Sequence, residues 1–116
     1  MDTFQRGHIW LVNFEPSFGH EYKKVRPALI IQSNKYIGSS NLLTIIPISS
    51  QVSKQSGLDI LLEKDSQNRL LSDSLIKIKQ ISSFDKRRFI KFIGNVNKDI
   101  MEKVENTLDA FLKDII

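Results

Sequence analysis

The chain has 116 residues and a formal net charge of +4, with 41% hydrophobic residues, 26% charged residues and no cysteine. Its length fits a single domain over residues 1–116. Its composition excludes an intrinsically disordered chain, and the absence of cysteine excludes disulfide frameworks, thiolate nucleophiles and cysteine-ligated metal centres. No run of about 18 apolar residues is present, and Asp2, Arg6 and His8 stand where a signal peptide needs an apolar stretch, so we expect a cytoplasmic protein with no membrane span.

The first half of the chain alternates apolar runs with polar connections. Residues 8–14 predict a first strand, because apolar, aromatic and β-branched residues dominate there. Residues 15–25 are polar, contain proline and glycine, and predict a loop longer than a tight hairpin needs, which is often functional. The apolar runs 28–32 and 42–48 predict strands covered on both faces, joined by a turn over residues 33–41.

The second half continues with short strands. Residues 58–62 predict one strand, and residues 74–80 predict another, whose period-two pattern gives one mostly apolar face. Residues 83–88 predict a short helical turn with Ser83 before its acidic and basic residues, leading into the apolar stretch 89–96.

The end of the chain predicts a helix over residues 98–113, because apolar residues recur there at helical spacing behind Asn97 as an N-cap candidate. We interpret its apolar stripe as facing the core, since a small sheet needs a cover; a partner-binding groove is the alternative. Many short strands closed by one long helix predict an α+β fold with a small, strongly curved antiparallel sheet or barrel.

Charge is concentrated in two basic clusters, one made of Lys23, Lys24 and Arg26 and the other of Lys86, Arg87, Arg88 and Lys91. They suggest a polyanion or an acidic peptide as partner, with a merely solubilising face as the alternative. The two histidines, His8 and His20, are too few for a histidine-rich metal site and leave open only one histidine with carboxylates.

Several short motifs occur in a characteristic order. The first three are RGHIW at residues 6–10, GHE followed by RPALII within residues 19–31, and PISSQ at residues 47–51. DSLI, KQI and DKRRF follow within residues 73–89. Together they resemble the MazF/PemK family of toxin ribonucleases, over nearly the whole chain.

The resemblance implies a plasmid-maintenance-like, SH3-like barrel and a homodimer. It also implies a metal-independent and cofactor-free endoribonuclease that cuts single-stranded RNA at short sequences. A cognate antitoxin, acidic at least in its C-terminal segment, is expected to fold over the same basic groove and block it. The implied catalytic residues are Arg26 and Ser49. Most family members have threonine at the second position, and serine lacks the methyl group that restricts χ1.

Metal-free RNA cleavage proceeds most easily by attack of the 2′-hydroxyl on the adjacent phosphorus, which leaves a 2′,3′-cyclic phosphate and a 5′-hydroxyl. A guanidinium matches two phosphate oxygens, so Arg26 suits stabilisation of the phosphorane, and the Ser49 hydroxyl can donate to a nonbridging oxygen. Arg26 is unsuited to proton abstraction, whereas His20 and Glu21 are both candidates for acid or base.

Substrate binding needs flat groups, polar base-reading groups and positive charge. The expected substrate-binding residues are Phe18, His20, Glu21, Gln51, Lys79 and Gln80. Phe18 suits base stacking but equally suits a loop anchor, and the two glutamines can read base edges. We expect the loop over residues 15–25 and the segment 51–57 to set the cut sequence.

Two other functions compete. CcdB-like toxins share the expected fold and bind gyrase without cutting nucleic acid, but their C-terminal tail carries a tryptophan, whereas Trp10 is the only tryptophan here. A degenerate family member that binds RNA or antitoxin without cleavage is the second alternative, which Ser49 leaves open. Without the resemblance, Arg26 is better explained as a surface charge that caps a strand.

Overall fold

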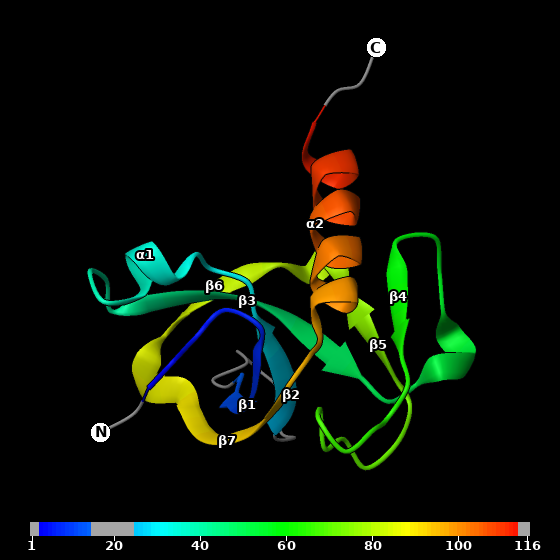
Figure 1. Ribbon diagram of the computed structural model, residues 1–116, viewed down its shortest axis with the longest axis horizontal. Helices are drawn as coiled ribbons and strands as arrows, with labels where there is room; N and C mark the ends of the chain where they lie inside the picture. Colours follow the sequence, from blue (N-terminus) through cyan, green and yellow to red (C-terminus); the bar gives the residue numbers. More distant parts are fainter. Residues whose placement is uncertain (1–2, 15–24, 114–116) are drawn as a thin grey trace, which may run out of the picture.

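A computed structural model describes residues 3–14 and 25–113 of the chain (Figure 1). Its strands are β1 (His8–Asn13), β2 (Val25–Ile30), β3 (Leu42–Ser49), β4 (Asp59–Leu62), β5 (Ser74–Lys77), β6 (Ser82–Asp85) and β7 (Phe89–Asn95). The helices are α1 (Asn34–Ile37) and α2 (Lys98–Leu112), with 3-10 turns η1 (Val52–Lys54), η2 (Ile78–Gln80) and η3 (Lys86–Arg88). The strands pair antiparallel in the order β4-β5-β3-β2-β1-β7, and β6 pairs with β3. The predicted α+β fold is confirmed, and the curved sheet is not closed.

The central strands are buried on both faces, as their continuous apolar runs predict. Side chains alternate along a strand, so Leu29 packs in one hydrophobic cluster while its neighbours Ala28 and Ile30 pack in the other. In β3, Ile46 and Ile45 divide between the clusters in the same way. The sheet therefore separates two cores.

Helix α2 begins as the sequence predicts, because the Asn97 side chain accepts a hydrogen bond from the backbone N–H of Ile100 at 2.9 Å. Val104 is fully buried against the first core. We predicted that the whole apolar stripe of this helix faces the core. The prediction is wrong toward the C-terminus, where Phe111 is exposed and Leu112 is 65% exposed. Figure 1 shows the reason: the end of α2 projects beyond the sheet.

Several boundaries differ from the prediction. Strand β2 begins at Val25 and so includes residues 26–27, while β5 ends at Lys77 instead of continuing to residue 80. A one-turn helix, α1, lies within the predicted turn over residues 33–41.

The helical turn predicted over residues 83–88 is wrong in its first half. Ser83 lies in β6, where it pairs with Thr44 of β3, and a hydrogen bond of 2.7 Å joins their hydroxyls. Asp85 caps the shorter turn η3, since its carboxylate accepts from the backbone N–H of Arg87 at 2.8 Å. Pairing with β3 takes the residues before Asp85 into the sheet.

Among the described residues, no helix has the length and apolarity needed to cross a membrane. The loop predicted over residues 15–25 lies outside the described residues, except for Val25 at the start of β2. Phe18, His20 and Glu21 therefore stay predictions, as do Lys23 and Lys24 of the first basic cluster.

Candidate functional site

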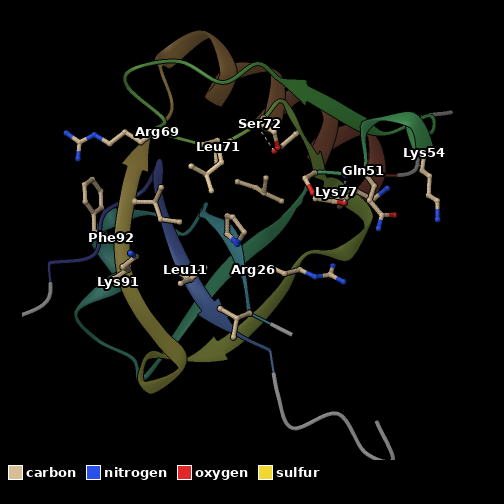
Figure 2. A pocket seen from close by; sticks show the side chains of 18 residues that line it. Leu11, Arg26, Gln51, Lys54, Arg69, Leu71, Ser72, Lys77, Lys91 and Phe92 are labelled. Carbon is tan, nitrogen blue, oxygen red and sulfur yellow. Dashed lines mark hydrogen bonds between the residues drawn. The ribbon is translucent and has the colours of Figure 1, made fainter. Parts of the chain in front are cut away.

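A cleft of about 810 Å³ opens where the ends of β2, β3 and β5 meet β7 (Figure 2). It contains Arg26, Ser49 and Gln51, three of the residues predicted to act on the substrate. The remaining polar and charged lining residues are Ser50, Lys54, Arg69, Ser72, Ser74, Lys77 and Lys91. The structure thus brings the two predicted catalytic residues into one site.

Strand register explains how Arg26 and Ser49 meet. The β2·β3 ladder pairs Ile30 with Ile45 and runs to Ala28 opposite Pro47. The ladder ends there: two residues further along, Arg26 pairs with Val12 of β1 and Ser49 pairs with Leu75 of β5. Side chains two residues apart share a face of a sheet, so both project from the same side. Proline has no N–H to donate, which is consistent with the ladder ending at Pro47 and freeing the strand ends for chemistry.

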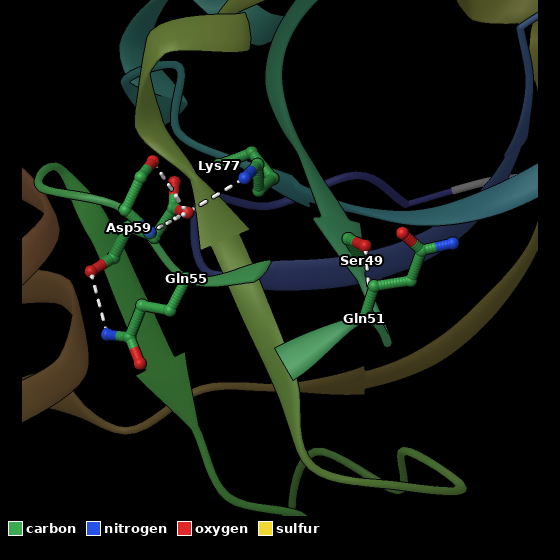
Figure 3. A network of polar contacts seen from close by, with 6 residues as sticks. Ser49, Gln51, Gln55, Asp59 and Lys77 are labelled. Atoms are coloured by element: carbon green, nitrogen blue, oxygen red, sulfur yellow. Dashed lines mark hydrogen bonds and ion pairs between the residues drawn. The ribbon is translucent and has the colours of Figure 1, made fainter. Parts of the chain in front are cut away.

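The two groups are suited to bind an anion. The guanidinium of the half-buried Arg26 makes no ion pair or hydrogen bond within the described part of the chain. The Ser49 hydroxyl oxygen accepts from the backbone N–H of Gln51 at 3.2 Å (Figure 3). Because that bond uses an oxygen lone pair, the hydroxyl proton of Ser49 is free to donate to a ligand.

The cleft is cationic. Among the described residues, its lining holds Arg26, Lys54, Arg69, Lys77 and Lys91 and no aspartate or glutamate. Lys77 forms an ion pair with Asp59, with 2.7 Å between Nζ of the lysine and a carboxylate oxygen. The other four cations have no carboxylate partner among the described residues. Such a lining attracts an extended anion.

Asp59 anchors the segment that carries Gln51 and Lys54. Its side chain is 3% exposed and accepts from Lys77 at 2.7 Å and from the backbone N–H of Ser56 at 2.9 Å (Figure 3). Burial raises the pKa of Asp59, but the hydrogen bonds from Lys77 and Ser56 outweigh burial and hold the pKa below its usual value. One carboxylate therefore fixes both a cleft lysine and the end of the neighbouring loop.

We expect Asp59→Asn to lower the free energy of unfolding by about 2 kcal/mol at pH 7, because Lys77 loses a buried counter-charge. The pKa of Asp59 is lower in the folded protein than in the unfolded chain, where an aspartate has a pKa of about 3.9. Its ionised carboxylate therefore stabilises the fold fully above that unfolded pKa. The stabilisation is lost as the pH falls through the lower pKa of the folded state. Urea unfolding should therefore show a difference from wild type that shrinks from pH 7 to pH 3. Asp109→Asn removes an exposed ion pair with Lys113 and should cost less than about 0.5 kcal/mol. This role would be contradicted if the two variants lost the same free energy of unfolding, or if the loss in Asp59→Asn did not change with pH.

The segment 63–73 contributes one wall of the cleft through residues 69–72, and none of its residues is a predicted site residue. Asn68, which is buried, organises them: its amide donates to the carbonyl of Glu63 at 2.9 Å and accepts from the N–H groups of Asp65 and Leu70 at 3.1 and 3.0 Å. Aspartate and asparagine at such spacing are a turn signal that could have located this wall.

Gly94 lets that wall lie directly on β7. A Cβ at Gly94 would be 2.6 Å from the carbonyl oxygens of both Gln67 and Asn68, and the N–H of Asn95 donates to the same Gln67 carbonyl at 3.1 Å. Glycine inside a predicted strand is a signal for such a close backbone approach.

Residues 5–112 match the family described as "PemK-like, MazF-like toxin of type II toxin-antitoxin system". The chain belongs to this toxin family. It is 29% identical over 109 residues to Endoribonuclease EndoA of Bacillus subtilis (strain 168), with 93% of both chains covered. It is 25% identical over 113 residues to Endoribonuclease MazF9 of Mycobacterium tuberculosis (strain ATCC 25618 / H37Rv), covering 93% of this chain and 95% of MazF9.

The fold agrees with that assignment. The crystal structure of MazF (Form-I) from Deinococcus radiodurans superposes with a TM-score of 0.79 at 25% identity, covering 97% of this chain and 98% of that one. The antiparallel sheet and the C-terminal helix of the MazF-like toxin are thus shared along almost their full length.

Two further predicted substrate-binding residues of this MazF-like toxin, Lys79 and Gln80, do not line the cleft. Gln80 lines a shallow depression of about 200 Å³ beside Phe14 and Pro47, and Arg26 borders both hollows. Lys79 is exposed on η2 and lines neither. Their contact with substrate stays a prediction.

Three of the four residues in the second basic cluster of the toxin bond to neighbouring groups and do not line the cleft. Lys86 donates to the carbonyl of Ile37 at 2.6 Å, Arg87 pairs with Asp85 at 3.0 Å, and Arg88 donates to the carbonyl of Asn13 at 3.3 Å. Only Lys91 of this cluster lines the cleft. Lys86 and Arg88 keep their charges, because a carbonyl does not neutralise them, and the interpretation of the whole cluster as a polyanion site stays a prediction.

In a chain without cysteine, carboxylate and imidazole side chains are the groups that could hold a metal ion. Within residues 3–14 and 25–113, no group of three or more such side chains is arranged to hold a metal ion.

Proposed function

We propose that residues 1–116 act as one toxin domain that cuts single-stranded RNA in the cleft around Arg26 and Ser49. The observation that carries the proposal is that a guanidinium and a hydroxyl proton, neither of which has a partner among the described residues, line one cationic cleft in which the described residues include no carboxylate. Similarity to proteins named as endoribonucleases supports the same reaction. A gyrase-binding toxin would not need this pairing of groups.

The reaction that suits these groups is transesterification within the RNA. The 2′-oxygen forms a bond to phosphorus, and the bond from phosphorus to the 5′-oxygen breaks. A base takes the proton of the 2′-hydroxyl, and an acid gives a proton to the leaving 5′-oxygen. Arg26 would bind two phosphate oxygens and stabilise the charge that develops on the phosphorane, while Ser49 donates to a nonbridging oxygen. Glu21 and His20 stay the candidates for proton transfer, because Arg26 keeps its proton.

The protein would work as a homodimer in the cytoplasm, where RNA and a cognate antitoxin meet it. We propose an antitoxin with an acidic segment that occupies the cationic cleft and competes with RNA there. That competition should weaken as salt rises, because screening reduces attraction between exposed charges.

The proposal is tested by incubating the purified protein with a long unstructured RNA in EDTA and mapping the product ends. We expect cuts at one short sequence, with 2′,3′-cyclic phosphates upstream and 5′-hydroxyls downstream, at the rate measured without chelator. No cleavage by folded protein would contradict the proposal, and gyrase inhibition would then be measured as the rival activity. Cuts that require a divalent metal would contradict the mechanism.

A further inference from the structure

We propose that Lys77 is a base-reading residue of the RNA site, whose ammonium donates to the two acceptor atoms on one edge of a guanine. The inference rests on the proposed function and deepens it. Lys77 lines the cleft with Ser49 and Gln51, and it is not among the site residues predicted from the sequence. Figure 2 shows its side chain at the same end of the cleft as Gln51 and Lys54, across from Arg69.

Strand register places Lys77 on the face of the sheet that carries Ser49. Ser49 of β3 pairs with Leu75 of β5, and Lys77 follows two residues later on β5. Residues paired across two strands share a face of the sheet, and so do residues two apart on one strand. Diagonal neighbours of this kind lie within reach of a long side chain. Lys77 therefore points to the same side of the sheet as the hydroxyl that we propose to act on the cut phosphate.

The ammonium of Lys77 is fixed in place without substrate. Its side chain is 20% exposed, and Nζ donates to the carboxylate of Asp59 at 2.7 Å (Figure 3). That carboxylate is itself buried and accepts from the backbone N–H of Ser56 at 2.9 Å. A side chain that is already ordered loses less rotamer freedom when a ligand binds than an exposed lysine does.

The remaining donors of Lys77 suit a neutral ligand better than a phosphate. An ammonium has three N–H donors, and Asp59 occupies one of them; the others have no partner among the described residues. Asp59 also offsets the charge of Lys77, whereas the four other cations of the cleft have no acidic partner in residues 3–14 and 25–113. Those four are the stronger attractors of phosphate. Lys77 is suited instead to two neutral acceptors that lie close together.

Guanine is the base with that pattern. Its N7 and O6 are neighbouring acceptors, and lysine can bind both of them. Adenine has an amino group in place of O6, and an ammonium has no acceptor for it. Pyrimidines present at most one acceptor on the corresponding edge. Because single-stranded RNA leaves base edges open to side chains, we expect the cut sequence to contain a guanine beside the cut phosphate.

The first test maps the ends produced from a long RNA in EDTA and scores each base at each position around the cut. Wild type should favour guanine over adenine about tenfold at one position. In the Asp59→Asn/Lys77→Gln double variant two amides replace the ion pair, so no buried charge is left unpaired. Glutamine pairs with N6 and N7 of adenine, so this variant should favour adenine at the same position. Asp59→Asn alone keeps the lysine and should keep the guanine preference.

A change in the substrate tests the same contact on the wild-type protein. An oligonucleotide with 7-deazaguanine at that position lacks the N7 acceptor and should be cut with a kcat/KM about tenfold lower, because a hydrogen bond to a charged donor is lost. Inosine lacks only the amino group on the far edge of the base and is the matched control, which should be cut at the normal rate. In the double variant, the change to 7-deazaguanine should have no greater effect than it has in wild type.

Salt dependence separates a base contact from a phosphate contact. The Kd for an RNA with a 2′-deoxynucleotide at the cut site is measured over a range of salt concentrations. If Lys77 contacts no phosphate, the slope of log Kd against log salt concentration should be the same in the double variant and in wild type. Lys54→Gln is the matched control, because Lys54 lines the cleft from η1 and has no acidic partner among the described residues. It should lower the slope by about 0.7 and keep the guanine preference.

The possible failures are distinguishable. Wild-type cleavage with no preference for guanine, or a guanine preference that persists in a folded double variant, would overturn base reading by Lys77 while the proposed function stands. A slope that falls by about 0.7 in the double variant would show a phosphate contact and overturn it as well. Wild-type protein that does not cut RNA overturns the proposed function and this inference with it.

Discussion

Arg26→Ala is expected to lower the rate of RNA cleavage about 10³-fold while the protein stays folded. The guanidinium suits stabilisation of the negative charge on the phosphorane. Removing one hydrogen-bond donor that stabilises a transition state commonly lowers kcat by about 10²- to 10³-fold. It makes no hydrogen bond within the described residues, so its removal leaves no buried group unpaired there. Arg26→Lys keeps the charge but loses the two-pronged geometry and should recover only part of the rate.

Single-turnover cleavage with saturating protein measures this effect separately from binding. Arg87→Ala is the matched control, because it also removes an exposed arginine but lies on η3, outside the cleft. Thermal unfolding checks that both variants are folded. A folded Arg26→Ala protein that cuts within tenfold of the wild-type rate would remove Arg26 from the catalytic machinery.

Gly94→Ala is expected to reduce the free energy of unfolding by about 3 kcal/mol and to weaken RNA cleavage as well. The new Cβ would lie 2.6 Å from the carbonyl oxygens of Gln67 and Asn68. Backbone atoms cannot relieve such a clash by changing rotamer, as a side chain can. The wall over residues 63–73 must therefore move away from β7. Because Arg69 lies on that wall, the cleft should lose substrate affinity together with stability.

Urea unfolding of Gly94→Ala beside Gly38→Ala measures the effect. A Cβ at Gly38 has no atom within 4 Å, so that variant should unfold within about 0.5 kcal/mol of wild type. If the two variants are equally stable, residues 63–73 do not depend on close contact with Gly94.

The sequence predicts the elements whose patterns arise from local burial. Strand β3 and helix α2 follow from apolar runs and helical spacing, and Asn97 caps the helix as expected. The end of β5 could not be predicted, because Lys77 ends the strand while paired across to Asp59, a contact 18 residues away in the sequence. The exposed end of α2 could not be predicted either, because its apolar residues recur at the same helical spacing as those at its buried beginning.

The candidate site was predicted through family resemblance and not through periodicity. The resemblance selected Arg26 and Ser49, and the β2·β3 pairing, which ends two residues from each of them, leaves both on the lining of one cleft. The wall carrying Arg69 was missed, because its position depends on Gly94 in a strand that is distant in sequence. The aspartate and asparagine spacing signals the turn itself, whereas its contact with β7 is signalled in the sequence by Gly94.

Attack by the 2′-hydroxyl inside the Arg26–Ser49 cleft is tested most directly by a single-atom change in the substrate. An RNA oligonucleotide with one 2′-deoxynucleotide immediately 5′ of the cut phosphate lacks the nucleophile and should bind with unchanged affinity but remain uncut. The same substitution one position further away should leave cleavage intact. Cutting of the modified phosphate at the wild-type rate would show that another nucleophile performs the reaction.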